Sequence, residues 1–213
     1  ICDHHETIEC VPNASAVLNP KQEECSYPLK ELAGVGVVFK LVQGIYKTLK
    51  YSIEELEQYL DLVALGTAAD IVPLIDENRV FVKFGLERIN KNPRSGVFAL
   101  IESSALIGRE INVSTIIYNL APRLNAVGRI SDAKTAVHLL TCKSLHQARN
   151  LAQILESMNK LRRDIDETTY NEALNLIEKS VDLNNDKIII LKKENWHPGV
   201  IGIVSSRIME KYN

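Results

Sequence analysis

Residues 144–180 constrain the fold more than any other stretch, because they contain neither proline nor glycine. Apolar residues recur there at steps of mostly three and four, which predicts one apolar face along a single helix. Such a helix would be about 55 Å long, more than an ordinary globular helix. We therefore predict a connector between two lobes, with a break near Asp166 as the alternative. Its middle carries charges interpreted as a solvated face: Arg162, Arg163, Asp164, Asp166 and Glu167.

The chain on the two sides of this helix is predicted to differ in class. Before it, apolar spacing predicts shorter helices at residues 34–49, 52–65, 77–90, 97–106, 113–120 and 131–140. Ser52 and Glu55 form a capping-box pattern, and Gly66 is expected to end that helix. After the long helix, Lys187–Lys192 predicts a buried strand, and a short strand is expected within residues 17–21. The predicted fold class is α/β and helix-rich.

Composition sets limits on the partners of the chain. A net charge of -2 gives no overall attraction for nucleic acid, so any such contact needs a local basic patch. Four cysteines without a C-x-x-C pair favour reduced thiols in the cytoplasm. A zinc site from Cys2, His4, Cys10 and Cys25 is an alternative, but its spacing fits no common zinc pattern. Neither a membrane-spanning apolar run nor a signal peptide is visible, so no membrane partner is expected.

The triplet Asp3-His4-His5 is the first candidate site. Each of these titratable side chains needs a partner when it leaves water. One interpretation is a strand end that delivers a metal ligand and a phosphate-contacting imidazole to a shared site. A solvated polar turn or the remnant of a tag is the alternative.

A second candidate lies in Gly66-Thr67-Ala68-Ala69-Asp70. Asp70 is a lone carboxylate among apolar and small residues, so it must be paired, used as a cap or bound to a metal. An Asx turn that opens the next segment is the other interpretation.

Two later stretches carry residues suited to phosphate. Arg123, Asn125 and Arg129 fall on a stretch broken by proline and glycine, and they offer directed donors to phosphate oxygens. In residues 196–207, Pro198 suits the first turn of a helix whose free N–H groups would attract phosphate. There Trp196 would stack a base and Arg207 would pair a phosphate. An ordinary surface loop and a packed strand-to-helix turn are the respective alternatives.

Asp-His-His and Gly-Thr-Ala-Ala-Asp resemble the third and fourth motifs of the DHH phosphoesterase superfamily. Pro-Arg-x-Asn-Ala-x-Gly-Arg at residues 122–129 is similar to RecJ-like single-stranded-DNA exonucleases, as are Pro-Lys, Tyr-Pro and Gly-x-Gly-x-x-x-Lys at residues 20–40. Residues 196–207 resemble the opening of a DHHA1 domain. The resemblance implies the C-terminal part of a DHH domain at 1–143, a connecting helix at 144–181 and the start of a truncated DHHA1 domain at 182–213.

The resemblance also implies a chemistry: metal-dependent 5′→3′ hydrolysis of single-stranded DNA in repair and recombination, with two Mn²⁺ or Mg²⁺ ions. His4 and Asp70 would ligate one metal, His5 would face the scissile phosphate, and Asp3 would orient an imidazole. The implied nucleic-acid-binding residues are Arg123, Asn125, Arg129, Trp196, His197, Gly199, Ser205 and Arg207.

Both ends of the chain are interpreted as internal to a longer polypeptide. RecJ-like proteins carry two further metal-binding motifs before Asp-His-His, and this chain starts at the third. We therefore expect the chain alone to bind manganese weakly and to cleave nothing. Two alternatives remain: a DHH phosphoesterase acting on oligoribonucleotides, cyclic dinucleotides or pyrophosphate, and a DHH protein that serves as a non-catalytic scaffold.

Overall fold

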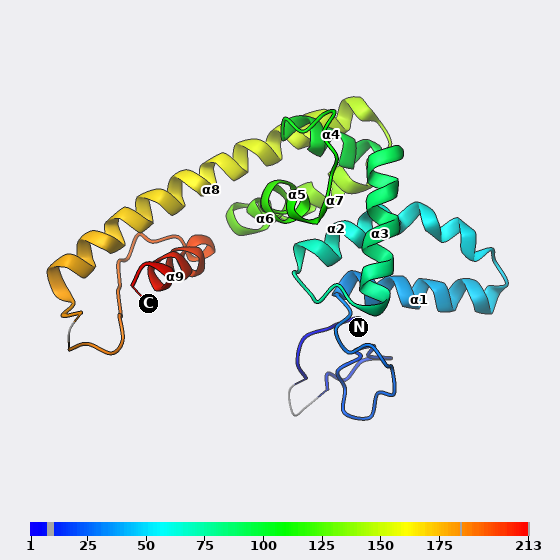
Figure 1. Cartoon of the computed structure of the whole chain (residues 1–213), viewed down its shortest axis with the longest axis horizontal. Helices are drawn as coiled ribbons and strands as arrows, with labels where there is room; N and C mark the ends of the chain where they lie inside the picture. The colour runs from blue at the N-terminus through cyan, green and yellow to red at the C-terminus, as the bar shows by residue number, and fades with distance from the viewer. Residues whose placement is uncertain (8–10, 184, 213) are drawn as a thin grey trace.

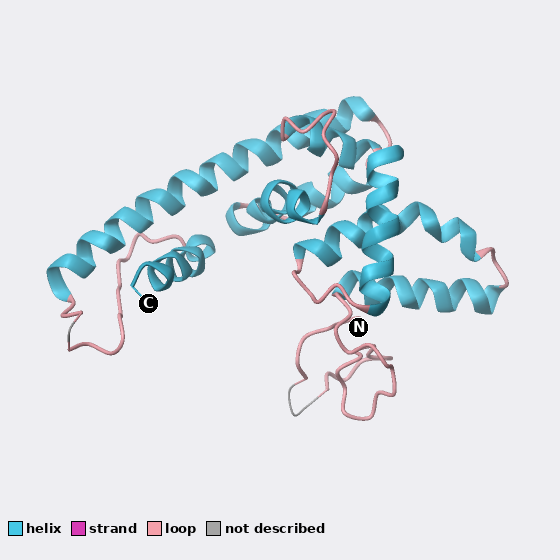
Figure 2. Cartoon of the chain, in the orientation of Figure 1, coloured by secondary structure: helices cyan, strands magenta, loops and turns pink. Residues whose placement is uncertain are grey.

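The computed structural model describes residues 1–7, 11–183 and 185–212, and it is built from helices (Figures 1 and 2). In chain order these are α1 Gly34–Leu49, the 3₁₀ helix η1 Ile53–Tyr59, α2 Leu60–Ala69, α3 Asp76–Lys91, α4 Ser95–Ser103, α5 Val113–Thr115, the π-helix η2 Ile116–Leu120, α6 Ala121–Ile130, α7 Lys134–Thr141, α8 Leu145–Ser180 and α9 Pro198–Tyr212. Over the described residues, β-structure is limited to one isolated parallel bridge between Cys2 and Leu18. The helix-rich character predicted from the sequence is therefore confirmed.

Helix α8 runs unbroken through Asp166 and is about 54 Å long. Its N-cap is Ser144, whose side chain accepts a hydrogen bond from the backbone N–H of Gln147. The first half of α8 packs into the larger hydrophobic core with α2, α4, η2 and α7, whereas its last turns pack with α9 in a smaller core. Figure 1 shows α8 extending from the main body of the molecule to the part that holds α9.

The strand predicted at Lys187–Lys192 is wrong. Ile189 and Leu191 pack against the smaller core, while Ile188 and Ile190 are exposed, so the side chains alternate as in a strand. A strand also needs backbone partners, and none of the other described segments pairs with this one. The β part of the predicted α/β class is therefore not formed in the described residues, and the strand expected within residues 17–21 reduces to the bridge at Leu18.

Two helical segments differ from their predictions. Ser52 makes no side-chain capping bond, and the chain enters α2 through the 3₁₀ helix η1. Gly66 lies inside α2 rather than past its end. The stretch after residue 120 was predicted to be broken by Pro122 and Gly128. Residues 113–130 instead form a continuous run of helical turns. Pro122 sits in the first turn of α6, where the N–H group that proline lacks is needed least.

Glycines allow the helices around α2 to approach closely. A Cβ atom on Gly66 would lie 2.8 Å from Val35 of α1, and one on Gly85 of α3 would lie 2.2 Å from the carbonyl oxygen of Leu60. Real Cβ atoms do not come this near to a backbone oxygen, so α3 would have to move. The contact of Gly66 with α1 lies near the end of α2, which carries Asp70, and the contact of Gly85 of α3 lies at the start of α2.

We expect Gly85→Ala to lower the free energy of unfolding by about 1–3 kcal/mol, because the added methyl group forces α3 away from α2. The matched control is Gly44→Ala in α1, where an added Cβ would meet nothing within 4 Å. That substitution should raise stability by up to about 1 kcal/mol through helix propensity. Urea unfolding of both variants measures the difference, and equal shifts in the same direction would contradict this packing.

Candidate metal and phosphate site

The segment that carries Asp3, His4 and His5 is held by the loop around Leu18. The Asp3 N–H donates to the Leu18 carbonyl at 2.9 Å, and the Leu18 N–H donates to the Ile1 carbonyl at 2.8 Å. The buried Asn19 adds a second tie, since its amide nitrogen donates to the His5 carbonyl at 2.9 Å. The backbone of the triplet is thus fixed on both sides of His4.

His4 and Asp70 meet although 66 positions separate them in the sequence. His4 Nε2 lies 3.2 Å from Asp70 Oδ2, with the His4 side chain 18% exposed and the Asp70 side chain 41% exposed. Gly34, at the start of α1, leaves room for the imidazole, because a Cβ there would be 3.2 Å from His4 Cδ2. This glycine therefore accommodates a ring of the candidate site.

Asp70 is placed by the end of α2. It is the C-cap residue of that helix, and its N–H donates to the Gly66 carbonyl at 3.0 Å. Ile71 follows in the left-handed region with φ 56°. A β-branched residue there costs roughly 1–2 kcal/mol, and such strain is concentrated at functional sites. The sequence gives no signal for this turn, because glycine or asparagine would be the usual choice.

The Asp3 side chain contacts the imidazole ring of His5 rather than the ring of His4 or the carboxylate of Asp70. Its Oδ1 lies 2.7 Å from His5 Nδ1 and accepts the backbone N–H of His4 at 2.8 Å. The hydrogen bond from the His5 ring, followed by the N–H groups of His4 and His5, lowers the pKa of Asp3 to about 2. An ionised carboxylate only accepts, so Nδ1 of His5 carries the hydrogen and Nε2 faces away from Asp3.

We expect Asp3 to titrate near pH 2 in the metal-free chain. Its folded pKa lies below that of an unfolded aspartate, about 3.9, so the bond to His5 is fully present above that value and is lost as the pH falls to about 2. His5→Ala should raise the pKa of Asp3, whereas His138→Ala, at an exposed helix histidine, should not change it. NMR of the Asp3 carboxyl carbon in EDTA measures both, and an unchanged pKa in His5→Ala would refute the pairing.

The donor set is small. Over the described residues, no group of three or more His, Cys, Asp or Glu side chains is arranged to hold a metal ion. The zinc alternative therefore gains no support from Cys2, His4 and Cys25, and Cys10 lies outside the described residues. His4 and Asp70 nevertheless fit part of a divalent-metal site, since an imidazole nitrogen and a carboxylate oxygen point at one place.

A second group of predicted residues meets where α6 and α9 touch. Arg129 Nη1 donates to the Gly199 carbonyl at 3.1 Å, and a Cβ on Gly199 would lie 2.4 Å from the Arg129 carbonyl oxygen. His197 Nδ1 accepts the N–H of Gly199 at 3.0 Å. This bond uses one of the N–H groups predicted to be free for phosphate at the start of α9. Gly199 thus serves the contact between the two helices.

Three of the predicted nucleic-acid residues are already engaged within the chain. Arg123 pairs with Glu156 and donates to the Asn119 carbonyl, with its side chain 14% exposed. The Trp196 indole donates to Glu172 at 2.8 Å, and its ring packs in the smaller core.

Arg207, the third of them, pairs with Glu167 at 3.1 Å and lies over the ring of Tyr170, 3.9 Å from its centroid. The remaining two, Asn125 and Ser205, are exposed.

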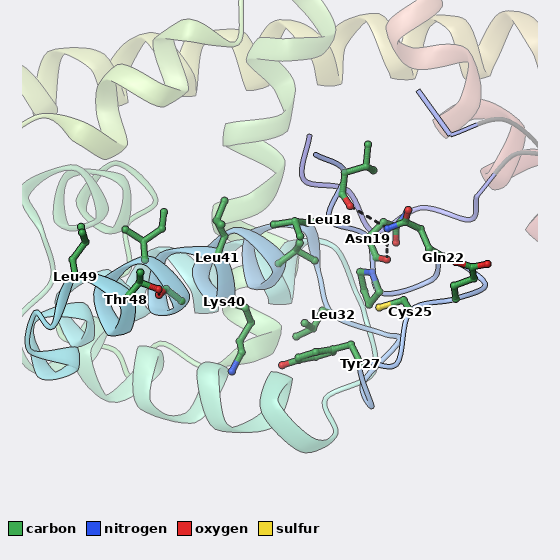
Figure 3. Close-up of a pocket in the computed structure, with 16 residues that line it drawn as sticks. Leu18, Asn19, Gln22, Cys25, Tyr27, Leu32, Lys40, Leu41, Thr48 and Leu49 are labelled. Carbon is green, nitrogen blue, oxygen red and sulfur yellow. Dashed lines mark hydrogen bonds between the residues drawn. The ribbon is translucent and has the colours of Figure 1, made fainter. Parts of the chain in front are cut away.

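A separate hollow of about 890 Å³ lies between α1 and the loop around Leu18 (Figure 3). Its walls are mainly apolar, and Tyr27 and Lys40 point toward one another at its edge. Both hold Glu77: Lys40 Nζ lies 2.7 Å from Oε1, and the Tyr27 hydroxyl donates to Oε2. Burial, followed by the bond to Glu77, raises the pKa of Tyr27. None of the predicted site residues lines this hollow, so it is not part of the His4–Asp70 site.

A family model and two curated proteins match the sequence of this chain. Residues 1–67 match the model described as DHH family, N-terminal domain. The single-stranded-DNA-specific exonuclease RecJ of Bacillus subtilis (strain 168) is 42% identical over 212 residues, which covers 100% of this chain and 26% of that protein. The RecJ of Escherichia coli (strain K12) is 38% identical, covering 100% of this chain and 39% of that protein. The chain thus spans well under half the length of these relatives.

Two solved structures share the fold. A crystal structure of exonuclease RecJ bound to manganese superposes with a TM-score of 0.83 at 33% identity, covering 99% of this chain and 51% of that chain. RecJ from Thermus thermophilus in complex with Mn²⁺ gives a TM-score of 0.84 at 31% identity, covering 98% of this chain and 30% of that chain. Together, these matches show that the chain is RecJ-like over its whole length and that its residues 1–67 match the DHH family.

Proposed function

We propose that this chain supplies part of the active site of a metal-dependent exonuclease that degrades single-stranded DNA from its 5′ end, in DNA repair and recombination. The observation that carries the proposal is the 3.2 Å approach of His4 and Asp70. The relatives that match the whole chain are named single-stranded-DNA-specific exonucleases, and two structural neighbours are described with bound manganese.

His4, through Nε2, and Asp70, through Oδ2, would hold a manganese or magnesium ion. When bound, such an ion supplies charge stabilisation at phosphoryl oxygens and lowers the pKa of water. His5 would act on the scissile phosphate of the DNA strand. Asp3 holds the Nδ1–H of the His5 ring, which leaves Nε2 to face the phosphate. With a hydrogen on Nε2 as well, the ring would donate to a phosphate oxygen. Asp3 is a positioning residue in this scheme.

Among the candidate nucleic-acid residues, we assign the strand contacts to the exposed Asn125, Arg129 and Ser205. The predicted residues that already bond within the chain would support the DNA strand contacts indirectly. Arg123 ties α6 to α8, and Arg207 ties α9 to α8. Trp196, His197 and Gly199 shape the start of α9.

We also propose the division into residues 1–143, 144–181 and 182–213, with α8 as connector and α9 in the opening of a DHHA1 domain. The two separate hydrophobic cores at the ends of α8 support this division. Among the described helices, none is both long and apolar enough to cross a bilayer. The free thiols of Cys2, Cys25 and Cys142 support placement in the reducing cytoplasm.

The chain by itself should bind Mn²⁺ weakly and leave single-stranded DNA intact, because two donors do not make a two-metal site. The loss of the free Mn²⁺ signal in electron paramagnetic resonance measures binding. Asp70→Ala should abolish that binding, and Glu178→Ala, at an exposed position of α8, should not. Degradation of DNA by the chain alone, or Mn²⁺ binding that survives Asp70→Ala, would contradict the proposal.

A further inference from the structure

Three arginines gather where α6 meets the middle of α8: Arg129 of α6, and Arg162 and Arg163 of α8. We call them the junction arginines. Burial lowers the pKa of the Arg162 guanidinium; Asp166 opposes this, and the positive charges of Arg163 and Arg129 lower the pKa further. The positive charges of Arg163 and Arg129 therefore both act on the Arg162 guanidinium, and α6 packs against α8 at this point.

The charge of Arg162 is poorly matched. Its side chain is only 15% exposed, and its nearest carboxylate oxygen, Asp166 Oδ2, is 3.9 Å from Nη1. The other terminal nitrogen lies 3.4 Å from Asn159 Oδ1. Nε is buried without a hydrogen-bond partner. A largely buried guanidinium in this state costs free energy until an anion or another acceptor reaches it.

The acidic groups nearby are shared with other arginines. Asp166 Oδ2 lies closer to Arg207, at 3.4 Å, than to Arg162. Glu156 divides its two oxygens between Arg123 and Arg163. Four arginines (Arg123, Arg162, Arg163 and Arg207) thus share three carboxylates (Glu156, Asp166 and Glu167), and the positive charge of Arg129 adds to theirs.

This local excess of positive charge is the basic patch that the composition requires of a nucleic-acid-binding chain. Of the five charged residues interpreted as a solvated face, Arg163, Asp164 and Glu167 are exposed, but the other two are not. Asp166 is buried, and Arg162 nearly so.

We propose that the junction arginines bind a backbone phosphate of single-stranded DNA, with Arg162 and Arg163 of α8 completing a site that Arg129 opens on α6. This inference rests on the proposed function and adds strand-binding residues to it. Access is provided by Arg163, whose side chain is 55% exposed, and by the exposed Arg129. Several guanidinium forks around one point suit a phosphodiester, which accepts directed hydrogen bonds on two oxygens.

Fluorescence anisotropy of a labelled oligo(dT), titrated with the 213-residue chain in EDTA over a range of KCl concentrations, tests the site. Each of Arg129→Gln, Arg162→Gln and Arg163→Gln should weaken binding about tenfold at low salt. Each should also reduce the slope of log K against log salt by about 0.7, the value for one contact to a single-strand phosphate. Arg162→Lys should keep the slope and lose affinity, because an ammonium cannot form the fork.

The matched control is Lys179→Gln, which removes the same charge from an exposed position about 25 Å further along α8. Its affinity and slope should equal those of the wild type. If Arg162→Gln fails to fold by circular dichroism, the exposed Arg129 and Arg163 variants decide. Slopes equal to that of the control, or no DNA binding by the wild-type chain, would overturn the inference. Mn²⁺ binding at His4 and Asp70 is measured separately, so either proposal can fail alone.

Discussion

Alanine in place of His4 or Asp70 will abolish DNA cleavage by a RecJ protein in which this chain replaces the matching stretch. The RecJ of Bacillus subtilis is the suitable host, since it is 42% identical over 212 residues. Loss of a direct metal ligand should lower the rate of Mn²⁺-dependent degradation of 5′-labelled single-stranded DNA by more than about 100-fold. Removal of an outer partner of a metal ligand already costs about 10–100-fold.

The controls for that experiment are a histidine and a carboxylate that lie away from the site. His138→Ala, on the exposed face of α7, should keep the activity of the unmodified chimera, and so should Glu178→Ala on α8. His5→Ala should fall between, because His5 is proposed to act on the phosphate without holding the metal. A folded chimera whose activity survives Asp70→Ala would show that this carboxylate has no part in the chemistry.

Arg94→Ala should be the most destabilising single substitution outside the site, at a cost of about 3–5 kcal/mol. Asp61 is fully buried, and Arg94 holds both of its carboxylate oxygens at 2.7 Å. Arg94 also donates to the Gln58 carbonyl at 2.8 Å. Without the guanidinium, the Asp61 carboxylate remains buried and uncompensated. Urea unfolding of the chain measures the loss of free energy of unfolding, provided that the dependence of this free energy on urea concentration is the same in the variant and the wild type.

A double variant tests whether the loss in Arg94→Ala comes from the unpaired Asp61 carboxylate. Arg94→Met combined with Asp61→Leu removes both charges, so it should regain most of the stability lost in Arg94→Ala. Arg149→Ala breaks the exposed pair with Glu102 and should change stability little. A loss below about 1 kcal/mol in Arg94→Ala, typical of an exposed pair, would contradict the assigned burial.

The sequence predicts the helices of this fold well wherever the signal is local. The ends of α1, α3 and α8 follow from apolar spacing and from the residues that flank each helix, and the observed ends lie within one residue of the predicted ones. The strand at Lys187–Lys192 was wrong because pairing depends on a second segment, which a local pattern cannot reveal. The π-turn of η2 and the 3₁₀ start of α2 likewise depend on packing around them.

In the candidate site, too, some features could be predicted from the sequence and others depend on packing. The family resemblance implied that His4 and Asp70 ligate one metal, and the structure has these two side chains 3.2 Å apart. Sequence reasoning missed the space that Gly34 leaves for the imidazole and the left-handed turn at Ile71, since both depend on three-dimensional contacts. It also treated Arg123 as a free donor. Helix packing alone decides which arginines pair with carboxylates of the same chain, as Arg123 does with Glu156.

The most direct test of the central claim is anomalous diffraction at the manganese edge from crystals of this chain grown with Mn²⁺. The account predicts a manganese peak bonded to Nε2 of His4 and a carboxylate oxygen of Asp70. Manganese bound only elsewhere, with His4 and Asp70 still paired directly to each other, would contradict it.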